Sequence, residues 1–173
     1  MCGIAGQISA DPNKIAANYP AYCRMQKSLA RRGPDQRGMY LHGHVALIHA
    51  RLAVVDLENG CQPMVLDQGG EKYILVYNGE LYNTAELRSE LLESGVHFMT
   101  ACDTEVLLYS YIVWGESCLD RLNGIYSFAI WQEKAKQLCL ARDRIGVKPL
   151  FYYEYSGGLI FASEIKALLA HPM

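Results

Sequence analysis

The chain has 173 residues, which is the length of one domain with a sizeable core. Apolar residues make up 51% and charged residues 20%, so a disordered or low-complexity protein is excluded. The net charge of −2 gives no reason to expect nucleic acid or an anionic membrane as a partner. No run approaches the roughly 18 apolar residues of a membrane span, and the N-terminus lacks a basic signal segment, so we expect a cytosolic protein.

The first half of the chain predicts strands around one long helix. We expect strands at 2–9, twice within 38–56 and at 73–77, and a helix over 14–30. Gly33-Pro34 stops the helix, and Asn78-Gly79 is expected to break the third apolar run after residue 77.

The second half begins with two helices and continues with strands. Residues 83–86 have the pattern of a capping box, and the helix they open is expected to end at Gly95. A second helix is expected over 104–114, behind Asp103. The remaining expected elements are strands at 125–131, 137–142, 150–153 and 159–162, and a helix that begins near 163. Strands in hairpin-like sets with helices in blocks favour an α+β fold with one or two largely antiparallel sheets.

The cysteines and histidines form no metal-binding pattern. The six cysteines are scattered without a C-x-x-C pair, which argues against a zinc site or a disulfide framework. We interpret most of them as reduced core residues, with Cys2 as the exception. The five histidines stand in no catalytic spacing and are interpreted as structural or surface residues. No glycine-rich nucleotide loop is present.

Cys2 is a candidate nucleophile because of its position. Removal of Met1 would make Cys2 the N-terminal residue, which then carries a thiol and a free α-amine of pKa about 7.7–8.0. The thiolate is the nucleophilic form, and an amine of that pKa is a suitable base to generate it. The alternative is that Cys2 is a small buried strand residue whose place at position 2 has no catalytic meaning.

Asn78 and Gly79 allow two interpretations. Asn-Gly is the strongest hairpin-turn dipeptide. An Asn amide beside an unhindered backbone N–H is also a good pair of donors for a tetrahedral oxyanion. Glu80 follows directly and offers a carboxylate at the same place.

Arg51 and Asp103 are candidate substrate-binding charges. Arg51 lies inside an apolar run, where its planar guanidinium would suit a substrate carboxylate or an internal acid such as Asp56. Asp103 precedes a predicted helix, so an ordinary N-cap is its alternative role.

Eight motifs occur in an order that resembles one family. They are CGIAG (2–6), RRGPDQRG (31–38), HARLAVVD (49–56), YNGELYN (77–83), DTEVLL (103–108), LNGIYSFAIW (122–131), DRIGVKPLFYY (143–153) and FASEIKAL (161–168). Together they resemble the glutaminase domain of class II, N-terminal-nucleophile glutamine amidotransferases, and among these the domain of glutamine-hydrolysing asparagine synthetases. The resemblance covers essentially the whole chain.

The resemblance implies a fold and a set of site residues. The fold is an αββα sandwich, with two stacked, mainly antiparallel sheets between helical layers. Cys2 is implied as the nucleophile, and Asn78 with Gly79 as the oxyanion hole. The implied glutamine-binding residues are Arg51 for the α-carboxylate, Glu80 and Asp103 for the α-ammonium group, and the backbone of Val54 and Val55.

The resemblance also implies the reaction and its partners. Glutamine is hydrolysed through a γ-glutamyl thioester, and the ammonia passes to a C-terminal synthetase domain that activates aspartate. No metal or cofactor is implied for this domain, because ATP and Mg²⁺ belong to the synthetase domain. A homodimer is compatible with the family. The chain stops after FASEIKAL without an ATP-pyrophosphatase loop, so we expect an excised or truncated glutaminase domain.

Two other functions remain open, and one residue departs from the pattern. The same domain could serve a different amidotransferase, or it could be a retired domain kept as a regulatory or interaction module. Cys102 stands where many relatives have a small Ser, a mild change that we expect to leave glutamine binding intact.

Overall fold

A computed structural model describes residues 1–53 and 60–172 and contains two antiparallel sheets. The five-stranded sheet has the order β2-β3-β1-β9-β8, and the four-stranded sheet has the order β4-β5-β6-β7. The strands of the first are β1 (Gly3–Ser9), β2 (Gln36–His42), β3 (Val45–Arg51), β8 (Phe151–Tyr155) and β9 (Gly158–Ala162). Those of the second are β4 (Met64–Gln68), β5 (Glu71–Leu81), β6 (Gly124–Gln132) and β7 (Gln137–Arg142).

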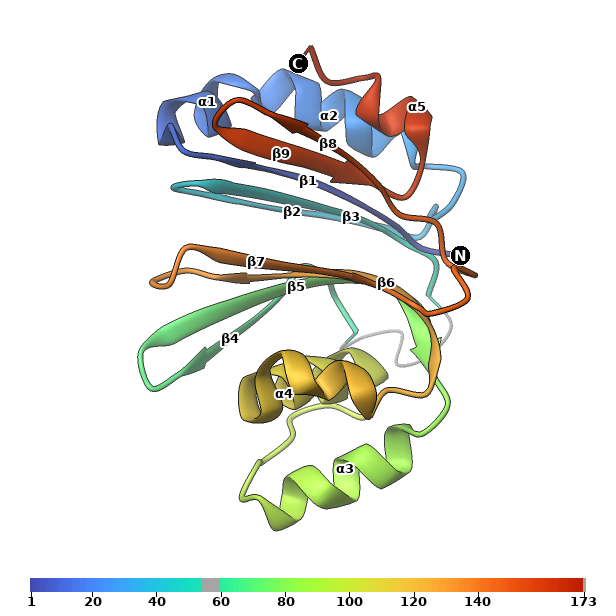
Figure 1. Cartoon of the computed structure of the whole chain (residues 1–173). Helices are drawn as coiled ribbons and strands as arrows, with labels where there is room; N and C mark the ends of the chain where they lie inside the picture. Colours follow the sequence, from blue (N-terminus) through green and yellow to red (C-terminus); the bar gives the residue numbers. More distant parts are fainter. Residues whose placement is uncertain (54–59, 173) are drawn as a thin grey trace.

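Helices cover the outer face of each sheet, as Figure 1 shows. The helices on the five-stranded sheet are α1 (Pro12–Ala17), α2 (Tyr19–Ser28) and α5 (Ile165–Leu168). Those on the four-stranded sheet are α3 (Thr84–Glu93) and α4 (Asp103–Trp114), which continues into a 3₁₀ turn, η1 (Gly115–Asp120). The predicted α+β fold with an αββα sandwich is therefore confirmed.

Alternation along the strands divides the apolar residues among three layers. Successive side chains of a strand point to opposite faces, so one strand serves two layers. On β3, Leu47 packs between the sheets while Ile48 packs under the helices. On β5, Val76 packs between the sheets while Leu75 faces α3 and α4. The central strands β3 and β5 are thus buried on both faces, which explains their almost unbroken apolar runs.

The single helix predicted over 14–30 is wrong, because two helices occupy this region. α1 ends at Ala17, and α2 begins at Tyr19 after Asn18. Pro20 explains the break, since it has no backbone N–H to continue the hydrogen bonds of α1. Proline is tolerated in the first turn of a helix, and that is where Pro20 lies in α2.

Two local predictions around β5 and α3 are also wrong. Asn78-Gly79 does not break the strand, because β5 pairs with β6 continuously from Tyr73 to Leu81. The capping box at the start of α3 does not form, because the Asn83 side chain makes no capping hydrogen bond. Its amide instead donates to the Arg121 carbonyl at 2.9 Å and its oxygen accepts from the Asn123 N–H at 3.0 Å. The sequence pattern also missed β4.

His49 connects the two sheets. It lies on β3, is 1% exposed, and its Nε2 is 3.0 Å from the backbone carbonyl of Tyr77 on β5. Burial, together with the charge of Arg51, lowers the pKa of His49 to about 4 against the opposing effect of the Tyr77 hydrogen bond. The imidazole is therefore neutral at physiological pH and donates through Nε2, a structural role that agrees with its interpretation from the sequence.

The pKa of His49 predicts how stability depends on pH. Between pH 6.5 and about 4 the unfolded chain binds a proton at His49 that the folded chain does not. The free energy of unfolding should therefore fall with decreasing pH in this window, by about 3 kcal/mol from this residue. His49→Gln, which keeps an N–H donor but does not titrate, should remove that part of the slope in denaturant unfolding measured across the window. The exposed His97, changed to Gln, is the matched control, and equal slopes for the wild type and His49→Gln would contradict the prediction.

Candidate active site

A cavity of about 250 Å³ lies where β1 begins, β3 and β5 end and α4 begins. It is lined by six of the residues predicted from the sequence: Cys2, Arg51, Asn78, Gly79, Glu80 and Asp103. Val54 and Val55, the other two predicted residues, lie outside the described part of the chain. Residues that are far apart in the sequence therefore meet at one end of the sandwich.

Strand alternation explains why the polar residues of β3 and β5 enter this cavity. Leu47 and Val76 point into the apolar layer between the sheets. Arg51 lies four positions after Leu47, and Asn78 and Glu80 lie two and four positions after Val76. An even separation keeps a side chain on the same face of its strand. The polar residues thus continue the inter-sheet faces beyond the point where the apolar layer ends.

Cys2 is held just before β1 by the chain that leaves β3. The Leu52 N–H donates to the Cys2 sulfur at 3.4 Å, and the thiol is 3.5 Å from the Leu52 carbonyl oxygen. The Cys2 carbonyl accepts a hydrogen bond from Arg32 Nε at 2.8 Å. Met1 also lines the cavity, with 56% of its surface exposed. The sulfur is therefore fixed beside a backbone donor, and Met1 stands next to it.

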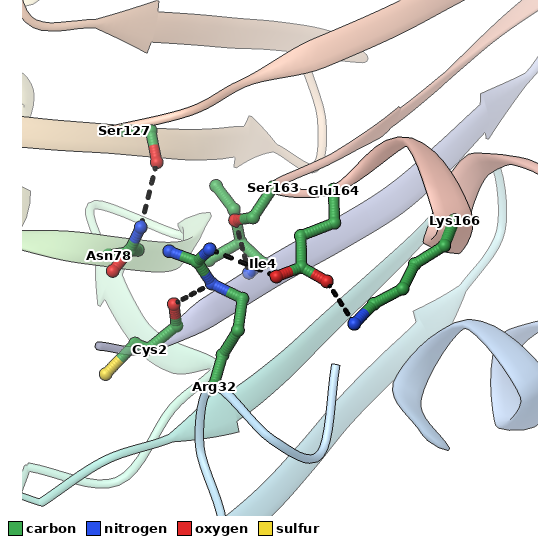
Figure 2. Close-up of polar contacts among 8 residues, drawn as sticks. All are labelled: Cys2, Ile4, Arg32, Asn78, Ser127, Ser163, Glu164 and Lys166. Carbon is green, nitrogen blue, oxygen red and sulfur yellow. Dashed lines mark hydrogen bonds and ion pairs between the residues drawn. The ribbon is translucent and has the colours of Figure 1, made fainter. Parts of the chain in front are cut away.

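Asn78 and Gly79 lie within a strand rather than in a turn. The Asn78 side chain is 1% exposed, and its amide donates to Ser127 Oγ at 3.5 Å on the neighbouring β6 (Figure 2). A Cβ at position 79 would lie 2.5 Å from the Ile125 carbonyl oxygen and equally close to the ring of Tyr77. Glycine is needed here for close packing, and its N–H is free of side-chain bulk next to the Asn78 amide.

The cavity carries charges of both signs. Arg51 is 5% exposed and donates to Gln36 Oε1 at 3.3 Å, while Glu80 is exposed at the rim. Asp56, the internal acid considered as a partner for Arg51, lies outside the described residues. Asp103 is the first residue of α4, and the N-cap position belongs to Cys102, so the N-cap role considered for Asp103 is not the one it has.

Asp103 is held by β5. Its carboxylate accepts hydrogen bonds from the Tyr77 hydroxyl at 2.9 Å and from the Leu81 N–H at 3.3 Å. Burial raises the pKa of Asp103, and these hydrogen bonds oppose the rise. Burial and the neighbouring Asp103 carboxylate also raise the pKa of Tyr77 well above its ordinary value, so the phenol stays protonated and donates.

Three further cavity residues were missed from the sequence. Tyr77 orients Asp103, and Gln62 accepts the Tyr77 N–H at 2.6 Å. Lys148 is 8% exposed, and its backbone N–H donates to Asp143 at 2.9 Å. Tyr77 and Lys148 stand inside the YNGELYN and DRIGVKPLFYY motifs, and Gln62 belongs to none of the motifs. No spacing rule links any of the three to Cys2.

The part of the chain that the structure describes contains no disulfide, no candidate metal site and no helix that could span a membrane. None of the six cysteines, all of which lie in that part, forms a disulfide. Within 1–53 and 60–172, no three His, Cys, Asp or Glu side chains are grouped so that they could hold a metal ion. No helix in these residues has the length and apolar character needed to cross a membrane.

Comparison with known proteins agrees with this geometry. A family model described as "Glutamine amidotransferase domain" matches residues 1–173. The chain belongs to this family. It is 49% identical over 172 residues to asparagine synthetase [glutamine-hydrolyzing] 3 of Bacillus subtilis, a match that covers 99% of this chain and 28% of that protein. It is 38% identical over 170 residues to asparagine synthetase [glutamine-hydrolyzing] 1 of the same organism, covering 98% of this chain and 27% of that protein.

Solved structures support the fold of this amidotransferase domain. The glutamine phosphoribosylpyrophosphate amidotransferase of B. subtilis superposes with a TM-score of 0.75 at 24% identity, over 98% of this chain and 43% of that one. The structure of the allosteric regulatory enzyme of purine biosynthesis gives a TM-score of 0.78 at 24% identity, with the same coverage. The chain spans little more than a quarter of the length of the two asparagine synthetases, so it corresponds to one part of such enzymes.

Proposed function

We propose that this amidotransferase domain hydrolyses glutamine to glutamate and ammonia through a covalent intermediate on Cys2. The observation that supports the proposal best is the cavity itself. It combines a thiol, an Asn amide beside a glycine N–H, and charges of both signs within about 250 Å³. In a domain that had lost its catalytic function, nothing would maintain all of these groups at one place.

The opposite charges of the cavity orient glutamine. Arg51 binds the α-carboxylate through its planar guanidinium, and Glu80 and Asp103 bind the α-ammonium group. Tyr77 keeps Asp103 in place by its hydrogen bond. With both charges of the amino acid bound, the side-chain amide is directed at the Cys2 sulfur, so the reaction is effectively intramolecular.

The chemical steps then follow from Cys2 and its neighbours. After removal of Met1, the α-amine of Cys2 takes the thiol proton, and the thiolate forms a bond to the side-chain amide carbon (Cδ) of glutamine. The oxyanion accepts hydrogen bonds from the Asn78 side chain and the Gly79 N–H. The carbon–nitrogen bond breaks as the α-ammonium of Cys2 returns the proton to the leaving nitrogen, which departs as ammonia. Water then cleaves the thioester, which gives glutamate and the free thiol.

We further propose that the ammonia is used by a synthetase domain that makes asparagine from aspartate. The two B. subtilis proteins named as glutamine-hydrolysing asparagine synthetases extend well beyond the matched region, which leaves room for such a domain. Activation of the acceptor by ATP with Mg²⁺ would belong to that domain. A cytoplasmic location fits, because a reactive thiol needs a reducing compartment.

The decisive experiment compares the chain with and without Met1. In a chain that retains Met1, the Cys2 nitrogen is an amide without a basic lone pair, and Met1 lines the cavity. Removal of Met1 with a methionine aminopeptidase should raise glutamate production by orders of magnitude, with processing followed by mass spectrometry. Processed Cys2→Ala is the matched control and should be inactive. Activity of that variant, or equal activity with and without Met1, would contradict the mechanism.

Asn78→Ala tests the oxyanion hole. The substitution removes one of the two proposed donors, so kcat should fall by about 10²–10³-fold. The KM for glutamine should change much less, because the donor acts mainly in the transition state. Steady-state glutaminase kinetics give both constants. A large rise in KM with a normal kcat would identify Asn78 as a ground-state binding residue instead.

Arg51→Ala and Arg51→Lys test the binding of the α-carboxylate. Arg51→Ala should raise the KM for glutamine strongly, because the substrate carboxylate loses its counter-charge. Arg51→Lys should restore binding only in part, since an ammonium group cannot form the paired hydrogen bonds of a guanidinium. If both variants bind glutamine normally, Arg51 has a purely structural role.

A further inference from the structure

Two sequence motifs with no role in the chemistry above meet at Cys2. They are RRGPDQRG (31–38), which contains Arg32, and FASEIKAL (161–168), which contains Ser163 and Glu164. Figure 2 shows these side chains around the start of β1. Ser163 and Glu164 follow β9 directly and lead into α5.

Ser163 fixes the strand that carries Cys2. Its N–H donates to the Ile4 carbonyl at 2.8 Å, and its hydroxyl accepts the Ile4 N–H at 3.0 Å. The strand pairing of β1 with β9 ends at Ala5 and Ala162. The Ser163 side chain therefore supplies one more paired position, two residues from Cys2, and it is 0% exposed.

Glu164 acts on Cys2 through Arg32. The Arg32 guanidinium donates from Nε to the Cys2 carbonyl at 2.8 Å and from Nη1 to Glu164 Oε1 at 3.2 Å. The two side chains are only 11% and 25% exposed, so water screens this ion pair weakly. Lys166 Nζ lies 2.6 Å from the other Glu164 oxygen. Arg32 therefore links Glu164 to the Cys2 carbonyl, and Lys166 contacts the Glu164 oxygen that Arg32 does not use.

We propose that Ser163 and Glu164 are positioning residues for the Cys2 nucleophile, Ser163 through Ile4 and Glu164 through Arg32. The inference rests on the proposed glutaminase function. Neither residue lines the cavity, so neither contacts the substrate. Their effect is to keep the sulfur at a fixed place relative to Asn78 and Gly79, and a small displacement of a reacting atom is enough to slow a reaction.

Kinetics of Glu164→Gln and Ser163→Ala test the proposal. Glu164→Gln keeps the shape of the side chain but removes its charge, and Ser163→Ala removes the acceptor for the Ile4 N–H. In processed protein, each should lower kcat roughly tenfold or more, with the KM for glutamine changed less than about twofold. The unequal effect on the two constants is the signature of positioning, because the glutamine-binding charges remain in place.

Matched controls separate positioning from a general loss of stability. Glu90→Gln removes the carboxylate of the exposed Glu90–Arg121 ion pair, and Ser110→Ala removes a buried hydroxyl that bonds within α4. Both should keep wild-type kcat and KM. A normal kcat in Glu164→Gln, a rise in KM instead of a fall in kcat, or an equal loss in the controls would overturn the proposal.

Labelling of Cys2 by iodoacetamide tests the same proposal without glutamine turnover. The rate is followed by peptide mass spectrometry, with the exposed Cys23 as internal reference. Glu164→Gln should slow labelling of Cys2 severalfold, because the shifted sulfur loses the Leu52 N–H donor. An unchanged labelling rate would overturn the inference. If the wild type makes no glutamate, the proposed function fails, and the labelling rates alone decide on positioning.

Discussion

The face-to-face packing of the two sheets is the constraint on which the site depends. Each strand must present apolar residues to the layer between the sheets at every second position. At the end of the sandwich where β3 and β5 end, this layer stops, but the alternation continues. Asn78 lies at the inward position after Val76 on β5, and Arg51 lies at the inward position after His49 on β3, so both line the cavity. The same strand alternation that builds the core therefore directs the polar side chains into the cavity.

Hydrogen bonds across layers convert this arrangement into a fixed geometry. Tyr77 points away from the inter-sheet layer and donates to Asp103 on α4, which brings a carboxylate from the outer helix to the cavity. His49 donates to the Tyr77 carbonyl and ties β3 to β5 next to Asn78. Because these groups are buried, an unmet partner would be costly, so each contact specifies one position of the strands.

Much of the fold could be predicted from the sequence, and the errors have local causes. Strand periodicity and apolar runs predicted most strands of both sheets and the helices α3 and α4. The break at Asn18 was missed because helical periodicity extends across Pro20. Asn78-Gly79 looked like a turn because local preference favours one, but pairing with β6 and the close approach of Ile125 keep the pair inside the strand.

The sequence by itself determined the family, because its eight ordered motifs resemble one family, and it named candidate site residues, six of which line the cavity. It also made Cys2 a candidate nucleophile, because removal of Met1 would place a thiol and a free α-amine in the same residue. Only the tertiary structure decided how the residues meet. Hydrogen bonds join Tyr77, Gln62 and Glu164 to residues distant in the chain, and no local pattern encodes such contacts. Packing of the two sheets creates these contacts, which is why they exist only in the folded protein.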